Sequence, residues 1–168
     1  MEKNTVIRKA TQADLPRVLE IYASARQFMR QSGNPTQWVE GYPQQALVEQ
    51  DIAQERLFVM TEDERIFGCF MLCAGPDPTY QQIFDGRWGY ETPYGVIHRV
   101  AGDGSKGGSV AGCVAFARQY YSHLRIDTHQ DNLPMQRSLQ RAGFTYRGTI
   151  LLENGDPRLA YDWLDTTK

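Results

Sequence analysis

The chain has 168 residues, 41% of them hydrophobic and 23% charged, which predicts a single domain over residues 1–168 with enough apolar side chains for a core. Its formal net charge of -2 argues against a nucleic-acid partner, because such partners usually require a basic stripe. No apolar run approaches the length of a membrane span, and the first residues, MEKNTVIRKAT, lack the apolar stretch of a secretory signal, so we expect a cytoplasmic protein with no membrane contact.

The first half of the chain reads as short strands and amphipathic helices. Apolar side chains recur at helical spacing after Thr11, Gly33 is expected to end that helix, and Pro43 is expected to open the next one. The turn TEDER between two apolar runs is typical of an antiparallel hairpin. We predict a strand over residues 6–9, a helix over 11–33, a helix over 43–55, and strands over 57–60 and 66–74.

The second half combines a strand, helix, strand unit with a closing hairpin. A loop over residues 75–95 comes first, and loops of this length in a compact domain tend to be functional. The short joints that follow it imply a pair of parallel strands. We predict strands over residues 96–101 and 124–128 around a helix over 110–121, then a helix over 133–142 and a hairpin over 146–152 and 159–164.

The stretch HRVAGDGSKGGSVAGC, residues 98–113, concentrates glycine between a predicted strand and a predicted helix. Glycine costs conformational entropy, so a cluster of it indicates a sharp bend or a close approach of the backbone to another group. A phosphate is the obvious candidate, because the amides at a helix start are unpaired and carry partial positive charge. A flexible turn without a ligand is the alternative interpretation of the loop alone.

Two stretches give the chain its resemblance to a known family. The glycine loop is similar to the Q/R-x-x-G-x-G/A motif, and the run DTHQDNLPMQRSLQRAGFTYRG places Asn132 eleven residues before Gly143 and Phe144. On these motifs the chain resembles the GCN5-related N-acetyltransferases, the GNAT superfamily, over essentially its whole length. The resemblance implies an α/β (α+β mixed) fold with a central, mostly antiparallel sheet, a splayed parallel pair of strands and flanking helices.

The resemblance also implies acetyl-CoA as the co-substrate, bound without a metal ion. The loop fits the motif in two registers, one on Lys106, Ser109 and Ala111 and one on Ser105, Gly108 and Val110, and both leave main-chain amides for the pyrophosphate. Lys106 would add a mobile positive charge. The residues expected to bind acetyl-CoA are Val100, Ala101, Ser105, Lys106, Gly107, Gly108, Ser109, Val110, Ala111, Asn132 and Met135.

The implied reaction is direct attack of an amine on the thioester, which calls for a base and an acid. His98 is the candidate base, with a satisfied strand histidine as the alternative; a backbone amide near Val100 would face the thioester oxygen. The tyrosine that the family often uses as the acid is replaced by Leu139, so Tyr80 or Tyr94 from the long loop becomes the candidate acid.

Three further groups keep more than one interpretation. His129 is read as an exposed loop histidine or as a second titrating group, and Asn132 as a helix cap or as a ligand of the pantetheine arm. The aromatic segments at residues 38–42 and 80–94 are read as core plugs or as the wall of an amine site. Asp77, Asp85 and Glu91 are candidates for attracting a cationic amine.

We therefore expect an N-acetyltransferase that acts on a primary amine of a small molecule or a peptide. A catalytically silent acyl-CoA-binding or sensor protein of the same fold is the alternative, and a homodimer stays open. The three cysteines lie in apolar segments without C-x-x-C spacing, which predicts free, buried thiols.

Overall fold

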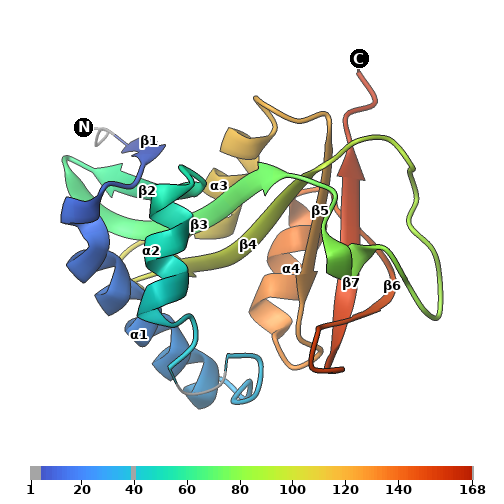
Figure 1. The fold of residues 1–168 in the computed structure, drawn as a ribbon, viewed down its shortest axis with the longest axis horizontal. Coiled ribbons are helices and arrows are strands. Elements are labelled where there is room, and N and C mark those ends of the chain that lie inside the picture. The colour runs from blue at the N-terminus through green and yellow to red at the C-terminus, as the bar shows by residue number, and fades with distance from the viewer. Residues whose placement is uncertain (1–4, 39–40, 168) are drawn as a thin grey trace. The chain divides into compact units, whose positions relative to one another are not determined.

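The computed structural model describes residues 5–38 and 41–167, and within them the chain forms seven strands and four α-helices (Figure 1). In chain order the elements are β1 (Thr5–Lys9), a 3-10 turn (Gln12–Asp14), α1 (Leu15–Gln31), α2 (Gln45–Ala53), β2 (Leu57–Glu62), β3 (Arg65–Ala74), a second 3-10 turn (Pro78–Tyr80), β4 (Gly95–Gly102), α3 (Ser109–Ala117), β5 (His123–Thr128), α4 (Leu133–Arg141), β6 (Thr145–Leu151) and β7 (Pro157–Leu164).

These elements belong to two compact units. The first unit contains residues 1–72 and 99–109, and the second contains residues 73–98 and 110–168. Strand β4 therefore contributes its first half to the second unit and its second half to the first unit.

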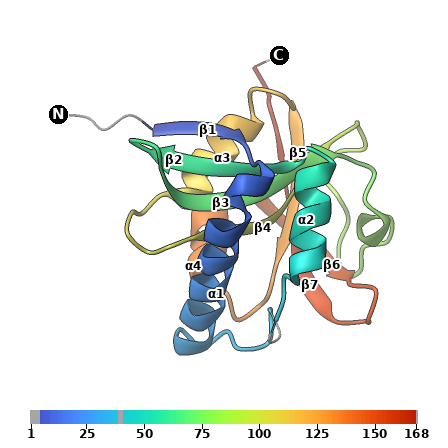
Figure 2. The ribbon, with the colours of Figure 1, turned by 60° about the vertical axis from the view of Figure 1, so that its left-hand side comes forward.

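In the first unit, β1, β2 and β3 pair antiparallel, and helices α1 and α2 pack on one face of them (Figure 2). Helix α1 follows a capping box in which the Thr11 N–H donates to Asp14 Oδ2 at 2.7 Å, and the predicted stop at Gly33 has the left-handed φ of +90°. The second helix begins at Gln45, two residues after Pro43. The buried core of this unit includes Val18, Ile21, Tyr22, Val48, Ile52, Leu57, Val59 and Cys69.

In the second unit, β4 starts parallel to β5, with Gly95 opposite Leu124 and Val96 opposite Arg125. Strands β5, β7 and β6 then pair antiparallel. The predicted fold class is confirmed: strands are mostly antiparallel, one pair is parallel, and helices flank them. Helix α3 ends at Ala117, four residues earlier than predicted, and residues 118–120 continue it only as turns.

All three cysteines are free, as predicted; Cys69 and Cys113 are buried and Cys73 is half-buried. Burial raises the pKa of the Cys69 thiol to about 12 and that of Cys113 further still, which keeps both thiols protonated and unreactive. None of the described helices is long and apolar enough to cross a lipid bilayer.

Candidate active site

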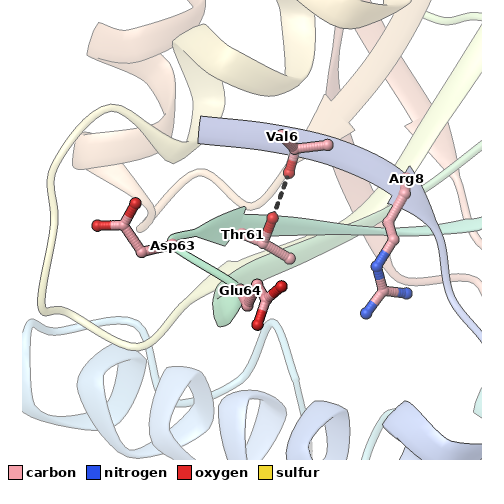
Figure 3. A pocket seen from close by; sticks show the side chains of 5 residues that line it. All are labelled: Val6, Arg8, Thr61, Asp63 and Glu64. Carbon is pink, nitrogen blue, oxygen red and sulfur yellow. Dashed lines mark hydrogen bonds between the residues drawn. The ribbon is translucent and has the colours of Figure 1, made fainter. Parts of the chain in front are cut away.

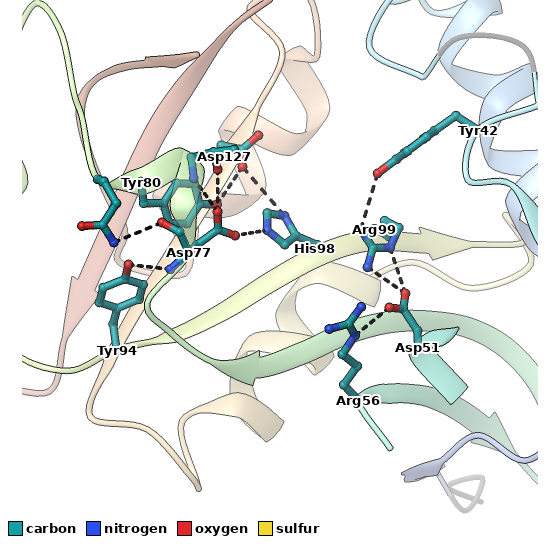
Figure 4. A network of polar contacts seen from close by, with 11 residues as sticks. Tyr42, Asp51, Arg56, Asp77, Tyr80, Tyr94, His98, Arg99 and Asp127 are labelled. Atoms are coloured by element: carbon teal, nitrogen blue, oxygen red, sulfur yellow. Dashed lines mark hydrogen bonds and ion pairs between the residues drawn. The ribbon is translucent and has the colours of Figure 1, made fainter. Parts of the chain in front are cut away.

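A network of carboxylates, one histidine and tyrosines gathers on the second unit (Figure 4). His98, in the first half of β4, places Nε2 2.8 Å from Asp77 Oδ2, and its Nδ1 lies 3.9 Å from Asp127 Oδ2. The Tyr80 hydroxyl donates to the same Asp127 oxygen at 2.7 Å. The predicted base therefore lies between two carboxylates, one of which it contacts directly.

The long loop presents Asp77 to His98 in a defined conformation. The Asp77 side chain caps the second 3-10 turn, because its Oδ1 accepts hydrogen bonds from the main-chain N–H and the hydroxyl of Thr79. The Asp77 N–H donates to the Tyr94 hydroxyl at 3.0 Å. Both carboxylate oxygens and the backbone of Asp77 are thus held from separate directions, which orients the acceptor that faces the histidine.

The protonation state of Asp77 assigns the tautomer of His98. Burial raises the pKa of the Asp77 carboxyl, but hydrogen bonds from His98 and Thr79 outweigh it, and the pKa falls to about 2. An ionised carboxylate only accepts hydrogen bonds, so Nε2 of His98 carries the proton and donates it to Asp77. In the neutral ring the lone pair then lies on Nδ1, on the side of Asp127.

The two candidate acids on the loop differ in what they do with their protons. Tyr80 is buried, and burial, together with the negative charge of Asp127, raises its pKa well above the usual 10. Its proton is engaged with Asp127. Tyr94 accepts a hydrogen bond from Asp77, a contact that leaves its own proton available to another acceptor.

Two tryptophans of the aromatic segments named from the sequence are buried among other rings. The Trp88 indole donates to the Tyr80 carbonyl at 3.0 Å, and the two rings lie 5.2 Å apart. In the first unit, Trp38 contacts Tyr22 and Tyr42 edge-on at 5.6 and 5.9 Å, while residues 39 and 40 of that predicted segment lie outside the described residues. These contacts favour the interpretation of Trp38 and Trp88 as core side chains over that of the wall of an amine site.

Strand β4 breaks its alternation directly after His98. Arg99 has a φ of +54°, a left-handed conformation that is unfavourable for a side chain of this size. Two contacts within the first unit hold it: the Tyr22 hydroxyl donates to the Arg99 carbonyl at 3.0 Å, and the Arg99 guanidinium pairs with buried Asp51 at 2.7 Å. Burial lowers the pKa of Arg99, but the Asp51 charge outweighs it and raises the pKa.

This bend is not predicted from the sequence pattern. In a regular strand Val96, His98 and Val100 would share one face, and the left-handed residue interrupts that order. The signal that could have found it is a charged residue, Arg99, in the middle of an otherwise apolar strand, since such a side chain needs a buried partner. That partner, Asp51, also accepts from Arg56 Nε at 2.7 Å.

The glycine loop leaves β4 and leads directly into the first residue of α3, Ser109. Gly104 and Gly108 have φ values of +83° and +84°, and a side chain built on either, or on Gly107, would meet nothing within 4 Å. The backbone is therefore exposed and open to an incoming group. Helix α3 also begins with main-chain N–H groups that have no acceptor within the helix, which suits a phosphate.

Lys106, predicted to add a mobile charge, is paired with a carboxylate in the structure. Its ammonium lies 2.6 Å from Glu62 Oε2, donates to Thr5 Oγ1 at 3.1 Å and stands 5.2 Å from the centre of the Phe67 ring. The reason is that the loop returns to the edge formed by β1 and β2, where Glu62 supplies an opposite charge.

On helix α4, Asn132 acts as the cap. Its Oδ1 accepts a hydrogen bond from the Met135 N–H at 3.1 Å, which confirms the interpretation of this residue as a helix cap. The predicted contact with the pantetheine arm stays a prediction. Leu139 is fully buried, which is consistent with a packing role at the position of the family's tyrosine. His129 is half-buried, accepts from the Asp131 N–H at 3.0 Å, and burial lowers its pKa.

A pocket of about 720 Å³ lies in the first unit beside β1 and β2 (Figure 3). It is lined by Val6, Arg8, Thr61, Asp63 and Glu64. Arg8 is paired with Asp14 at 2.8 Å and the Thr61 hydroxyl donates to the Val6 carbonyl at 2.9 Å. Arg8 and Thr61 are thus already engaged by other groups of the protein.

Comparisons with known proteins agree with this fold. The model of the acetyltransferase (GNAT) domain family matches residues 4–145. A GNAT-family acetyltransferase from Streptococcus agalactiae is similar in structure, with a TM-score of 0.85, 26% identity and 95% of each chain covered. No curated protein matches the chain.

Two further solved structures share the fold. An acetyltransferase described as putative from Staphylococcus aureus has a TM-score of 0.69 and 21% identity, covering 96% of this chain and 99% of its own. A ribosomal-protein-alanine N-acetyltransferase from Brucella melitensis has a TM-score of 0.63 and 19% identity, covering 95% and 99%.

Proposed function

The chain belongs to the GNAT acetyltransferase domain family, and on that premise we propose that it transfers an acetyl group from acetyl-CoA to the primary amine of a small molecule or a peptide. The observation that carries the proposal is the Asp77–His98 pair, whose histidine lies on the strand that leads into the glycine loop. The family membership supplies the reaction class, and this pair supplies a group able to accept the amine proton.

The glycine loop is the proposed site of the pyrophosphate. Its open backbone at Gly104, Gly107 and Gly108 fits a bulky anion, and main-chain donors from residues 105–111 would contact it. The contacts of Val100, Ala101, Asn132 and Met135 with the rest of the acetyl-CoA molecule remain part of the proposal. Main-chain N–H groups can bind a phosphate whatever the side chains are, so this site is compatible with the departures of the loop from the family motif.

His98 is the proposed base. With Nε2–H donated to Asp77, the Nδ1 lone pair is the atom that can take a proton from the attacking amine, directly or through one water. The separation of 3.9 Å between Nδ1 and Asp127 is long for a hydrogen bond and suits a bridging water. Asp77 then stabilises the imidazolium that forms.

Tyr94 is the better of the two candidate acids. A proton is needed on the thiolate of CoA when the thioester breaks, and Tyr80 has committed its proton to Asp127. Tyr94 has not committed its proton in its contact with Asp77. The main-chain N–H near Val100 is proposed to face the oxygen of the thioester, a role that requires no particular side chain.

The acceptor is proposed at the level of its chemical class. Asp77 and Asp127 give the site negative charge, which favours an amine that carries positive charge in solution. Because the chain shares its fold with a ribosomal-protein-alanine N-acetyltransferase, peptide amines stay among the proposed acceptors.

The test has a binding part and a turnover part. Acetyl-CoA should raise the melting temperature of the protein, whereas NAD and ATP should not, and thiol release should be followed over amines, peptides and aminoglycosides. His98→Ala should lose most of the rate while the KM for acetyl-CoA changes little. Binding of acetyl-CoA without turnover of any amine would instead support the silent acyl-CoA-binding alternative.

A further inference from the structure

The tip of the β2–β3 hairpin carries two opposite charges that face each other. Glu62 is the last residue of β2 and Arg65 the first of β3, and the two are paired across the hairpin. Both side chains contact the glycine loop, which belongs to the same unit. The loop offers the complementary charges in reverse order, with Asp103 at its start and Lys106 at its middle.

The acidic side of the tip holds Lys106. The Glu62 side chain is only 14% exposed, and its Oε2 lies 2.6 Å from Lys106 Nζ. Thr5 on β1 accepts a second bond from the same ammonium at 3.1 Å, and the ring of Phe67 lies beneath it. Because the Glu62 carboxylate is largely shielded, solvent screens this pair less than a pair of fully exposed groups.

The basic side of the tip holds Asp103. Arg65 Nη1 lies 2.8 Å from Asp103 Oδ2, and Arg65 Nη2 donates to Ser105 Oγ at 2.6 Å. Arg17 Nη2 lies 2.6 Å from the same oxygen of Asp103. The Asp103 N–H also donates to the Phe67 carbonyl at 2.9 Å. Burial raises the pKa of Asp103, but the bonds from Ser105 and Arg65 outweigh it, and the pKa falls to about 2.

We propose that the hairpin tip is a charge-complementary clamp in which Glu62 and Arg65 are positioning residues that hold the glycine loop in its anion-binding shape. A loop this rich in glycine samples many conformations, and ordering it at the moment of binding would weaken affinity. In one ion pair the hairpin supplies the negative charge, and in the other it supplies the positive charge. Together the two pairs select one register of the loop and leave Gly104, Gly107 and Gly108 open. That the anion is acetyl-CoA rests on the proposed function.

The clamp gives Lys106 a role different from that of a phosphate ligand. An ammonium already paired with Glu62 anchors the loop, whereas a phosphate ligand would have to leave that carboxylate when acetyl-CoA binds. If Lys106 anchors the loop, exchanging the charges of the pair should preserve binding of acetyl-CoA. If Lys106 is a phosphate ligand, the same exchange should weaken that binding.

The experiment exchanges the charges of this pair. Glu62→Lys and Lys106→Glu are made singly and together, and Glu64→Lys, at an exposed residue of the same turn, makes the same charge change away from the pair. The first readout is amide hydrogen exchange of residues 104–108 in the ligand-free protein. The second is the KM for acetyl-CoA, compared with kcat and the KM for the amine.

The clamp predicts that each single reversal speeds exchange in the loop and raises the KM for acetyl-CoA roughly tenfold, with the amine KM unchanged. The double exchange should restore both to within about threefold, and Glu64→Lys should resemble the wild type. Unchanged exchange in the single variants, or a double variant as impaired as Lys106→Glu, would overturn the clamp. The exchange readout needs no ligand, so it judges the clamp even if acetyl-CoA proves to be the wrong co-substrate.

Discussion

Replacing Asp77 by asparagine tests the central contact of the proposed active site. The substitution keeps the size of the side chain but removes the negative charge that faces His98 Nε2 at 2.8 Å. An amide can also turn its NH₂ toward that nitrogen and favour the wrong tautomer. Both effects destabilise the imidazolium that forms when His98 takes a proton, so kcat should fall roughly 10²-fold while the KM for acetyl-CoA changes little.

The same substitution has a consequence for stability that can be sized from the pKa. The pKa of Asp77 falls from 3.8 to about 2 on folding, a depression worth about 2 kcal/mol, or roughly 1 to 2 kcal/mol after screening by solvent. Because the folded-state pKa is lowered, this stabilisation is present above the unfolded-state value and is lost as pH falls from about 4 to about 2. Asp77→Asn should lack that part of the acid dependence.

The assay combines urea unfolding at several pH values with steady-state kinetics. The free-energy difference between wild type and Asp77→Asn should be largest at neutral pH and should shrink by roughly 1 to 2 kcal/mol between pH 5 and pH 2. Asp85→Asn, at an exposed carboxylate of the same loop, is the matched control for the unfolding measurement and should leave the pH dependence of stability unchanged. A wild-type kcat together with a pH-independent stability difference would refute the reasoning.

Three other changes test the remaining parts of the site. Tyr94→Phe should lower kcat roughly 10²-fold if this residue protonates the thiolate. Tyr80→Phe should mainly lower the free energy of unfolding, by about 1 to 2 kcal/mol, because it loses its hydrogen bond to Asp127. Equal kcat values in the wild type and both variants would reject an acid on this loop. Gly108→Val forces a branched side chain to a φ of +84° and should weaken acetyl-CoA binding at least tenfold by calorimetry, so unchanged affinity would place the phosphate elsewhere. Leu139→Ala should cost about 2 to 5 kcal/mol in urea unfolding, and a loss of activity beyond that of the unfolded fraction would contradict its packing role.

Local patterns in the sequence were sufficient for most of the helices and strands and for the family motifs. The helix stop at Gly33 and the cap at Asn132 depend on residues a few positions apart, so they are readable without a fold. The same holds for the open loop before α3, because clustered glycine has few other uses. His98 could be named as a candidate because few residue types titrate near neutral pH.

The contacts that would give these residues a function join positions far apart in the chain. His98 and Asp77 are separated by 21 residues, Lys106 and Glu62 by 44, and Arg99 and Asp51 by 48. One-dimensional patterns record which residues carry charge, but the partner of a charge depends on how β4, its preceding loop and the hairpin pack. The sequence by itself therefore determined the fold class and the family resemblance, and only the tertiary structure decided which carboxylate holds the histidine and that Lys106 is anchored by Glu62.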